Sequence, residues 1–146
     1  MPEPSIVTAE QQRASDEGYL ARGDTIAIQI WEGSAPGELH IHHQHDIAWH
    51  VLAGTLRFRF ADGERDAPAG STVFIPAGTP HTYGLEVALS EGKPEGFTRY
   101  LVIAPPRLFD LFAALQVART GRPHTDWGNG PDKDIYAQFD SELLEP

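Results

Sequence analysis

The chain of 146 residues carries 21 acidic and 11 basic side chains, which gives a formal net charge of −10. This balance argues against a nucleic-acid or anionic-membrane surface, because phosphate contacts need clustered Lys and Arg. The absence of cysteine excludes disulfides, thiolate metal sites and cysteine nucleophiles. The sequence has no signal-peptide pattern and no apolar run of membrane-spanning length, so we expect a cytoplasmic protein.

The 14 glycines and 12 prolines predict many turns and favour an all-β fold over a helical bundle. We expect a single domain made of an N-terminal arm over residues 1–24, a β-barrel over 25–104, a helix over 105–121 and a C-terminal tail over 122–146. β-branched and alternating patterns predict strands at residues 25–31, 38–43, 47–53, 55–60, 71–75, 81–89 and 97–103. Asp62-Gly63 favours a hairpin. Strands of this length between Gly and Pro turns indicate a sandwich or a closed barrel.

Pro105-Pro106 introduces the predicted helix, and Gly121 follows its end. Its apolar residues recur at helical spacing: Leu108, Leu111, Phe112 and Leu115. This apolar face is expected to cover the barrel or a partner subunit. Because strand edges in so small a barrel also need covering, we expect a homodimer.

Six of the seven histidines gather in two places. Five lie between residues 40 and 50, and His81 follows a turn that contains Pro76 and Gly78. Alternate residues of a strand share a face, so His40 and His42 would point the same way, and the turn would place His81 on a neighbouring strand. Three converging imidazoles suit one divalent transition-metal ion (Fe, Ni, Cu, Zn or Mn), among which the sequence does not choose.

These residues resemble those of a known family. Gly70-x5-Pro76-x-Gly78-x2-His81 matches the second motif of the cupins, and residues 39–42 followed by 49–54 are similar to the first motif. The resemblance covers about residues 25–119 and includes the apolar helix after Pro105-Pro106, as in small quercetin-dioxygenase-like cupins. It implies a cupin barrel (double-stranded β-helix, jelly-roll) with a C-terminal helix, and a metal site of three histidines and one glutamate.

The sequence departs from that pattern at two positions. Ile47 stands where the family has its glutamate ligand, and Leu85 stands where an asparagine often follows the second-motif histidine. A three-histidine site, as in similar cupins of the thiol-dioxygenase and diketone-cleaving types, is one interpretation. In a second, Asp46 is the fourth ligand, which requires a one-residue slip that turns the next strand over. In a third, the cavity has lost its metal and holds an organic ligand.

The alternation of the strand at residues 47–53 favours the unslipped register. Its apolar set of Ile47, Trp49 and Val51 makes a better interior than the set of Ala48, His50 and Leu52. Ile47 and Trp49 are therefore candidate substrate-binding residues, although a buried Trp more often fills the core. Tyr83 is a third candidate because it shares a strand face with His81, although such a Tyr more often lines a pocket.

The resemblance implies an oxygenase-type oxidoreductase that acts on a small anionic or enol-like substrate through the metal. Because Ile47 cannot act as the base that glutamate provides in quercetinase-like relatives, flavonol cleavage is not expected. The alternatives are a non-catalytic cupin that binds a small molecule and a metal-assisted isomerase or lyase. The fold does not decide among them.

Overall fold

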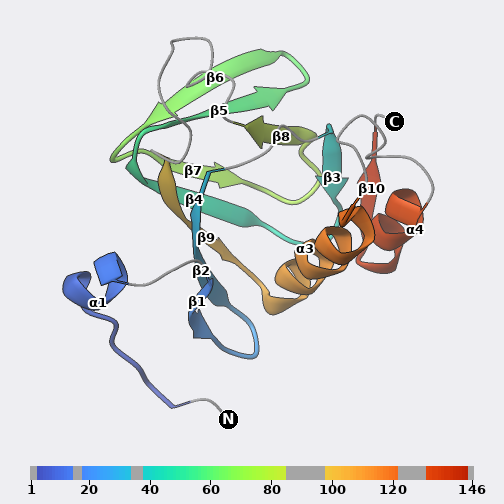
Figure 1. The fold of residues 1–146 in the computed structure, drawn as a ribbon. Helices are drawn as coiled ribbons and strands as arrows, with labels where there is room; N and C mark the ends of the chain where they lie inside the picture. Colours follow the sequence, from blue (N-terminus) through green and yellow to red (C-terminus); the bar gives the residue numbers. More distant parts are fainter. Residues whose placement is uncertain (1–2, 15–17, 34–37, 85–97, 122–130, 145–146) are drawn as a thin grey trace.

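The computed structural model describes residues 3–14, 18–33, 38–84, 98–121 and 131–144. Within these residues the strands form two five-stranded antiparallel sheets (Figure 1). The first sheet has the order β1 (Gly18–Arg22), β2 (Ala27–Glu32), β9 (Arg99–Ala104), β4 (Ile47–Ala53) and β7 (Thr72–Ile75). The second has the order β10 (Ser141–Leu143), β3 (His40–His42), β8 (His81–Gly84), β5 (Thr55–Phe60) and β6 (Gly63–Pro68). The predicted all-β jelly roll is confirmed.

The interior of the first sheet is built by strict alternation along β4. Ile47, Trp49 and Val51 are buried, and Ile47 lies opposite Ile75 of β7. Asp46, just before the strand, is exposed. The register is therefore the unslipped one, in which β-branched and aromatic side chains fill the space between the sheets.

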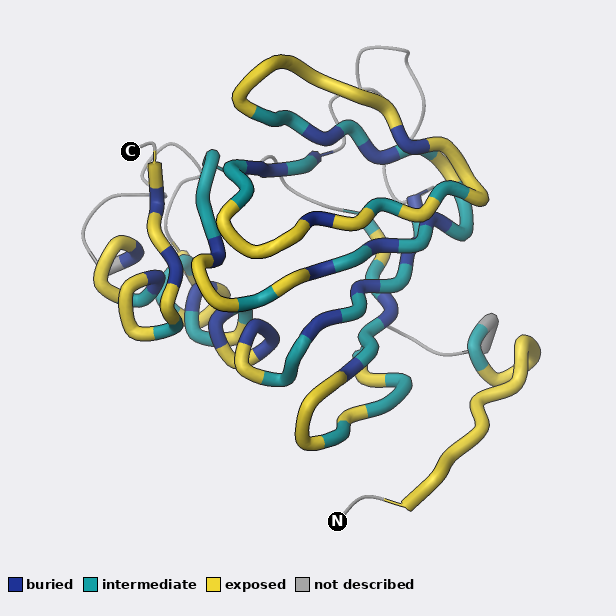
Figure 2. The backbone as a smooth tube through the Cα atoms, turned by 180° about the vertical axis from the view of Figure 1, so that it is seen from behind, coloured by how far each residue is buried: buried dark blue, intermediate teal, exposed yellow. Residues whose placement is uncertain are grey.

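The second sheet contributes the other half of the core. Leu56 and Phe58 of β5 are buried, and Phe58 lies edge-on to Trp49 with ring centroids 5.1 Å apart. The predicted hairpin is present, since Phe60 pairs with Gly63 where β5 turns into β6. Figure 2 shows that the buried residues concentrate in the central strands, whereas the N-terminal segment is exposed.

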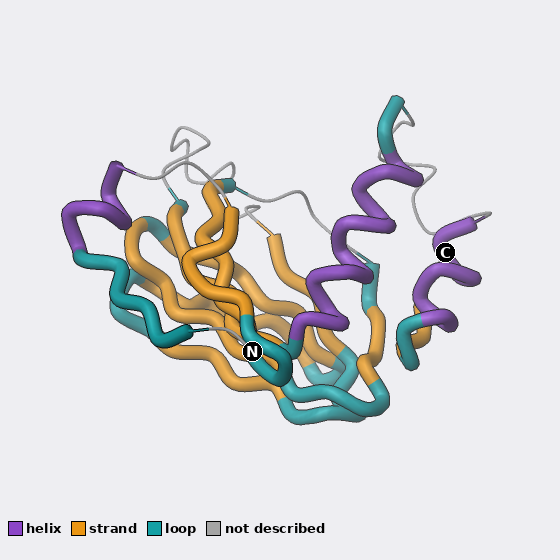
Figure 3. The backbone as a smooth tube through the Cα atoms, turned by 90° about the horizontal axis from the view of Figure 1, so that it is seen from below, coloured by secondary structure: helices purple, strands orange, loops and turns teal. Residues whose placement is uncertain are grey.

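Helix α3 (Pro106–Arg119) runs along the side of the sheets, with α4 (Pro131–Gln138) on its outer side (Figure 3). Its buried residues are Leu108, Phe109, Leu111 and Leu115, so the expected apolar face includes Phe109 as well. Phe112 is half-buried and lies edge-on to Trp31, with centroids 5.9 Å apart. Among the described residues, no helix combines the length and the apolar character needed to cross a membrane.

Both ends of the chain contain regular structure. The predicted arm holds α1 (Ala9–Ala14) and β1, which pairs with β2. The predicted tail holds α4 and β10, and β10 pairs with β3. The strand expected at 81–89 is described as far as Gly84; the rest of it, including Leu85, lies outside the described residues.

Candidate metal centre

Three histidines from two neighbouring strands face one another. His40 and His42 lie on β3, and His81 opens β8 directly opposite His40. The ring centroids are 4.5 Å apart for His40 and His81, 4.9 Å for His40 and His42, and 5.3 Å for His42 and His81. One nitrogen from each ring lies within 4.8 Å of the others. A small movement of the rings would bring all three to about 2.1 Å from a shared ion.

The turn before β8 fixes the position of His81. Gly78 has a φ of 85°, a conformation that side chains other than glycine rarely adopt. This conformation lets its N–H donate to the carbonyl of His42 over 2.8 Å, which ties the turn to β3. The N–H of Ala77 donates to the carboxylate of Asp46, also over 2.8 Å. Asp46, the suggested fourth ligand, thus faces the turn and is not part of the three-histidine cluster.

Backbone carbonyls orient two of the three imidazoles. Nδ1 of His40 lies 2.8 Å from the carbonyl oxygen of Glu38, and Nδ1 of His81 lies 2.8 Å from that of Thr79. A carbonyl oxygen only accepts hydrogen bonds, so each Nδ1 must carry the proton. The lone pair on each Nε2 is then available to a metal ion.

A serine orients the third imidazole. Nδ1 of His42 lies 2.8 Å from Oγ of Ser141, and this hydroxyl donates to the carbonyl of Phe139 over 3.1 Å. Because the hydroxyl has one proton, it accepts from His42, whose Nε2 therefore carries a lone pair. Nε2 of His42 is buried and has no hydrogen-bond partner among the described residues. A buried polar atom without a partner is costly, and a metal ion would satisfy it.

Burial keeps the three imidazoles neutral. It lowers the pKa of His40 to about 3, with a further contribution from the neighbouring His81. It lowers the pKa of His42 to about 2, and His40 and His81 add to that effect. Burial also lowers the pKa of His81. Neutral imidazole is the form that binds metal ions, so the donor set fits a transition-metal ion.

The histidines line a cavity of about 670 Å³. Aromatic side chains form much of its wall: Trp31, Trp49, Tyr83, Phe112 and Tyr136. Ile47 and Gln29 also line it. All three candidate substrate-binding residues therefore face the same space as the histidines.

Trp49 and Tyr83 pack together beside His81. The Trp49 ring lies 5.3 Å from Tyr83 and 6.0 Å from His81, measured between centroids. Nε1 of Trp49 is buried without a hydrogen-bond partner in the described part of the chain. The Tyr100 hydroxyl donates to the carbonyl of Gly33 over 2.7 Å, so the Tyr83 hydroxyl, 3.4 Å away, acts as the donor to Tyr100.

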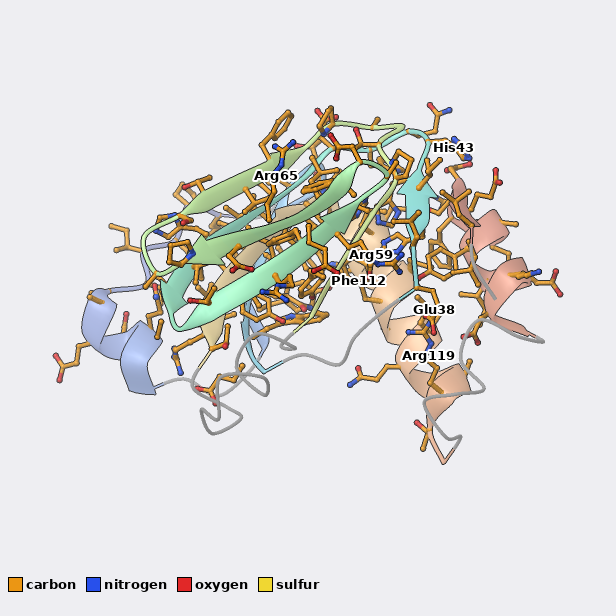
Figure 4. All side chains as sticks on the ribbon, turned by 90° about the horizontal axis from the view of Figure 1, so that it is seen from above. Glu38, His43, Arg59, Arg65, Phe112 and Arg119 are labelled. Atoms are coloured by element: carbon orange, nitrogen blue, oxygen red, sulfur yellow. The ribbon has the colours of Figure 1, made fainter. Side chains whose placement is uncertain are left out.

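A buried ionic network adjoins His40. Arg119, at the end of α3, pairs with Glu38 over 3.5 Å and with Asp132 of α4 over 3.0 Å. Figure 4 shows Glu38 and Arg119 meeting beside α3. Tyr136 of α4 packs against His40 with centroids 5.3 Å apart, and burial raises its pKa to about 12, so it remains a neutral phenol.

The other described histidines are not members of the cluster. His43 pairs with Glu142 over 3.3 Å at the surface, and His50 lies 2.8 Å from the Thr72 hydroxyl on the outer side of the sheet. His45 is half-buried, and His124 lies outside the described residues.

Sequence reasoning did not identify four residues around the cluster: Glu38, Arg119, Tyr136 and Ser141. None of them belongs to a motif. The sequence does hold one local signal for structure in the tail: Asp132 and Asp134 lie in the first turn of α4, and acidic residues are typical of the start of a helix.

Comparison with known proteins agrees with this architecture. Residues 26–87 match the family model of the cupin domain. The protein has the cupin fold. Comparison with curated proteins gave no match.

Solved structures resemble this chain at low sequence identity. A protein from Bacillus halodurans, BH2720, is 20% identical with a TM-score of 0.55, and the match covers 72% of this chain and 83% of that one. A cupin-2 domain containing protein from Shewanella frigidimarina is 19% identical with a TM-score of 0.54, covering 68% and 94%. KdgF from Halomonas sp. is 18% identical with a TM-score of 0.51, covering 65% and 82%. At these identities the likeness concerns the fold and not the substrate.

Proposed function

We propose that this cupin binds one divalent transition-metal ion through Nε2 of His40, His42 and His81 and acts as an oxygenase-type oxidoreductase on a small anionic or enol-like substrate. One observation carries the proposal: all three imidazoles use Nδ1 for a hydrogen bond within the protein, which leaves three Nε2 lone pairs close together. The buried, unpartnered Nε2 of His42 supports it.

A divalent ion held by three neutral imidazoles would keep its full charge and open coordination positions, and would act as a Lewis acid that lowers the pKa of an enol or carboxylic acid. The Nδ1 hydrogen bonds of the histidines hold each ring in the ligating tautomer. Ile47 makes the adjoining wall apolar and excludes water from it.

The cavity wall favours a substrate with a flat, apolar part. Trp49 and Tyr83 offer aromatic surface next to His81, and Ile47 adds aliphatic surface. The one arginine among the described residues that line the cavity, Arg119, is paired with two carboxylates. Selection for an anionic oxygen would therefore come from the metal centre and not from Arg119.

The site offers little help with proton removal. Of the described residues that line the cavity, Glu32 is the one carboxylate, and it pairs with Arg99 over 2.5 Å. Ile47 cannot accept a proton. The substrate is thus expected to be an acidic enol or a carboxylate, which needs no strong base.

The metal site can be tested by substitution. Purified protein loaded separately with Fe, Ni, Cu, Zn or Mn is expected to retain one ion per chain, measured by elemental analysis. His42→Ala and His81→Ala should lose it, because each removes one of three ligands. His50→Ala is the matched control, since His50 lies on the outer side of β4, and it should retain the ion. Undiminished metal in His81→Ala would contradict the site.

The reaction class can be tested with the loaded protein. Oxygen consumption is measured against a panel of enols, carboxylates and thiols, with His81→Ala as the control. Oxygen uptake with one member of the panel supports the oxygenase. Turnover without oxygen would show a metal-assisted isomerase or lyase, and tight binding without turnover would show a non-catalytic binding protein.

A further inference from the structure

We infer that the C-terminal segment of residues 131–143 is part of the metal centre, with Ser141 as a positioning residue that sets the tautomer of His42. The inference rests on the proposed role of His42 as a ligand. It assigns a functional role to a stretch of chain that lies outside the matched cupin domain, residues 26–87.

The backbone places Ser141 opposite His42. Strand β10 pairs with β3 in antiparallel register, with Ser141 facing His42 and Leu143 facing His40 (Figure 1). Asp140, with a φ of 58°, turns the chain from the end of α4 into β10. The carbonyl of Asp140 accepts a hydrogen bond from the N–H of His43, which closes the start of the strand pair. The main-chain pairing thus places Ser141 beside His42.

The Ser141 side chain can only accept from His42. Ser141 and His42 are 5% and 2% exposed, so water does not compete for either group. The hydroxyl proton goes to the carbonyl of Phe139, which leaves Oγ as the acceptor for Nδ1–H. Removing Oγ would leave a buried Nδ1–H without an acceptor. Neither ring nitrogen would then have an acceptor, so the Nδ1–H form would lose the hydrogen bond that favours it, and the proton would shift towards Nε2, the atom that has to be free to bind the ion.

The same segment reaches His40 by a second route. Asp132 in the first turn of α4 pairs with Arg119, and Arg119 pairs with Glu38. The carbonyl of Glu38 accepts the Nδ1–H of His40. Residues 131–143 therefore supply the hydrogen-bond partner of His42, and they are linked through the ion pairs of Arg119 to Glu38, the partner of His40.

The test compares Ser141→Ala with Ser141→Thr and with the control Glu142→Gln. Glu142 is the exposed neighbour on β10 and pairs with His43, away from the cluster. Zinc affinity is measured by competition with a chromophoric chelator. We expect Ser141→Ala to weaken zinc binding by about 10- to 100-fold, the usual effect of losing a partner of a ligating histidine. Ser141→Thr should restore most of the affinity, and Glu142→Gln should leave it unchanged.

The second readout needs no metal. Long-range ¹H–¹⁵N spectra of the histidine rings distinguish Nδ1–H from Nε2–H in the metal-free protein. Wild type should show His42 as Nδ1–H, and Ser141→Ala should move its proton to Nε2. If Ser141→Ala does not fold, Ser141→Thr and Ser141→Val form an isosteric pair that differs in the hydroxyl alone, and the same contrast is expected between them.

An unchanged His42 tautomer in Ser141→Ala, or in Ser141→Val, would overturn the inference, and so would unchanged zinc affinity in a wild type that binds zinc. If wild type binds no metal, the proposed function fails, and the tautomer spectra alone then decide whether Ser141 positions His42. The two failures are therefore distinguishable.

Discussion

Ile47 occupies the inner face of β4, opposite Ile75, at the position where the motif comparison predicts a carboxylate ligand. An aliphatic side chain there leaves the three imidazoles as the ligand set of the described cluster. Three neutral ligands would bind an ion less tightly than three neutral ligands and an anion, but would leave it more strongly electrophilic. We expect this residue to have more effect on the choice of substrate than on the fold.

Protonation of the buried histidines should control the stability of the metal-free protein. The pKa of His40 is about 3 and that of His42 about 2, both below the ordinary 6.5. Below about pH 6.5 the unfolded chain therefore binds protons that the folded chain does not. The contribution of these histidines to the free energy of unfolding is fully present above that pH. It should be lost as the pH decreases, by up to about 1.4 kcal/mol per pH unit for each histidine.

Urea unfolding of the metal-free protein at a series of pH values from neutral to acidic measures this loss of stability. His42→Asn should show a smaller loss, because one titrating group is gone. The surface variant His50→Asn should behave like wild type, since His50 is bonded to Thr72 at the outer face. Equal stability at neutral and mildly acidic pH in wild type would contradict the expectation.

The turn between β7 and β8 is the element that joins the fold to the candidate site. Gly78 has a φ of 85°, and a Cβ built on it would meet nothing within 4 Å. Gly78→Ala should therefore cost only the backbone strain, about 1–2 kcal/mol in the free energy of unfolding. Gly78→Asn should cost less, because asparagine tolerates this conformation better.

Chemical denaturation gives these values, and zinc titration of the same variants shows whether the strain reaches His81. We expect Gly78→Ala to weaken metal binding, since the N–H of Gly78 ties the turn to the His42 carbonyl. Gly78→Ala with the stability and the zinc affinity of wild type would show that the turn does not need this conformation.

Local patterns predicted the elements that carry the histidines. The alternation along β4 predicted which of its faces is buried. The turn at Pro76 and Gly78 predicted that His81 lies on a strand next to β3. Ser141 was not predictable, because it lies 99 residues from His42 and β10 is too short to show a period. The pairing of Arg119 with Glu38 likewise joins distant elements, so neither residue had a local pattern to identify it.

At the scale of the whole molecule, we expect a homodimer that forms through the outer face of the first sheet. Phe74 lies on β7, one of the two edge strands of this sheet, and is 62% exposed. It begins an apolar row across the sheet, through Ala48 and Ile103 to Ile28. Phe74 is the exposed member of this row, and the other three residues are half-buried. An apolar side chain exposed at a sheet edge is commonly covered by a second copy.

Sedimentation equilibrium should give twice the mass of one 16.0 kDa chain. Phe74→Glu should shift the equilibrium towards the single chain without changing the metal content, because Phe74 lies on the face opposite the cavity. A wild-type protein that sediments as one chain at all concentrations would contradict the dimer.

Anomalous diffraction from crystals grown with zinc tests the metal centre most directly. One strong anomalous peak is expected between β3 and β8, at about 2.1 Å from Nε2 of His40, His42 and His81. Histidine rings turned away from one another, or zinc bound elsewhere with this cluster empty, would contradict the proposed centre.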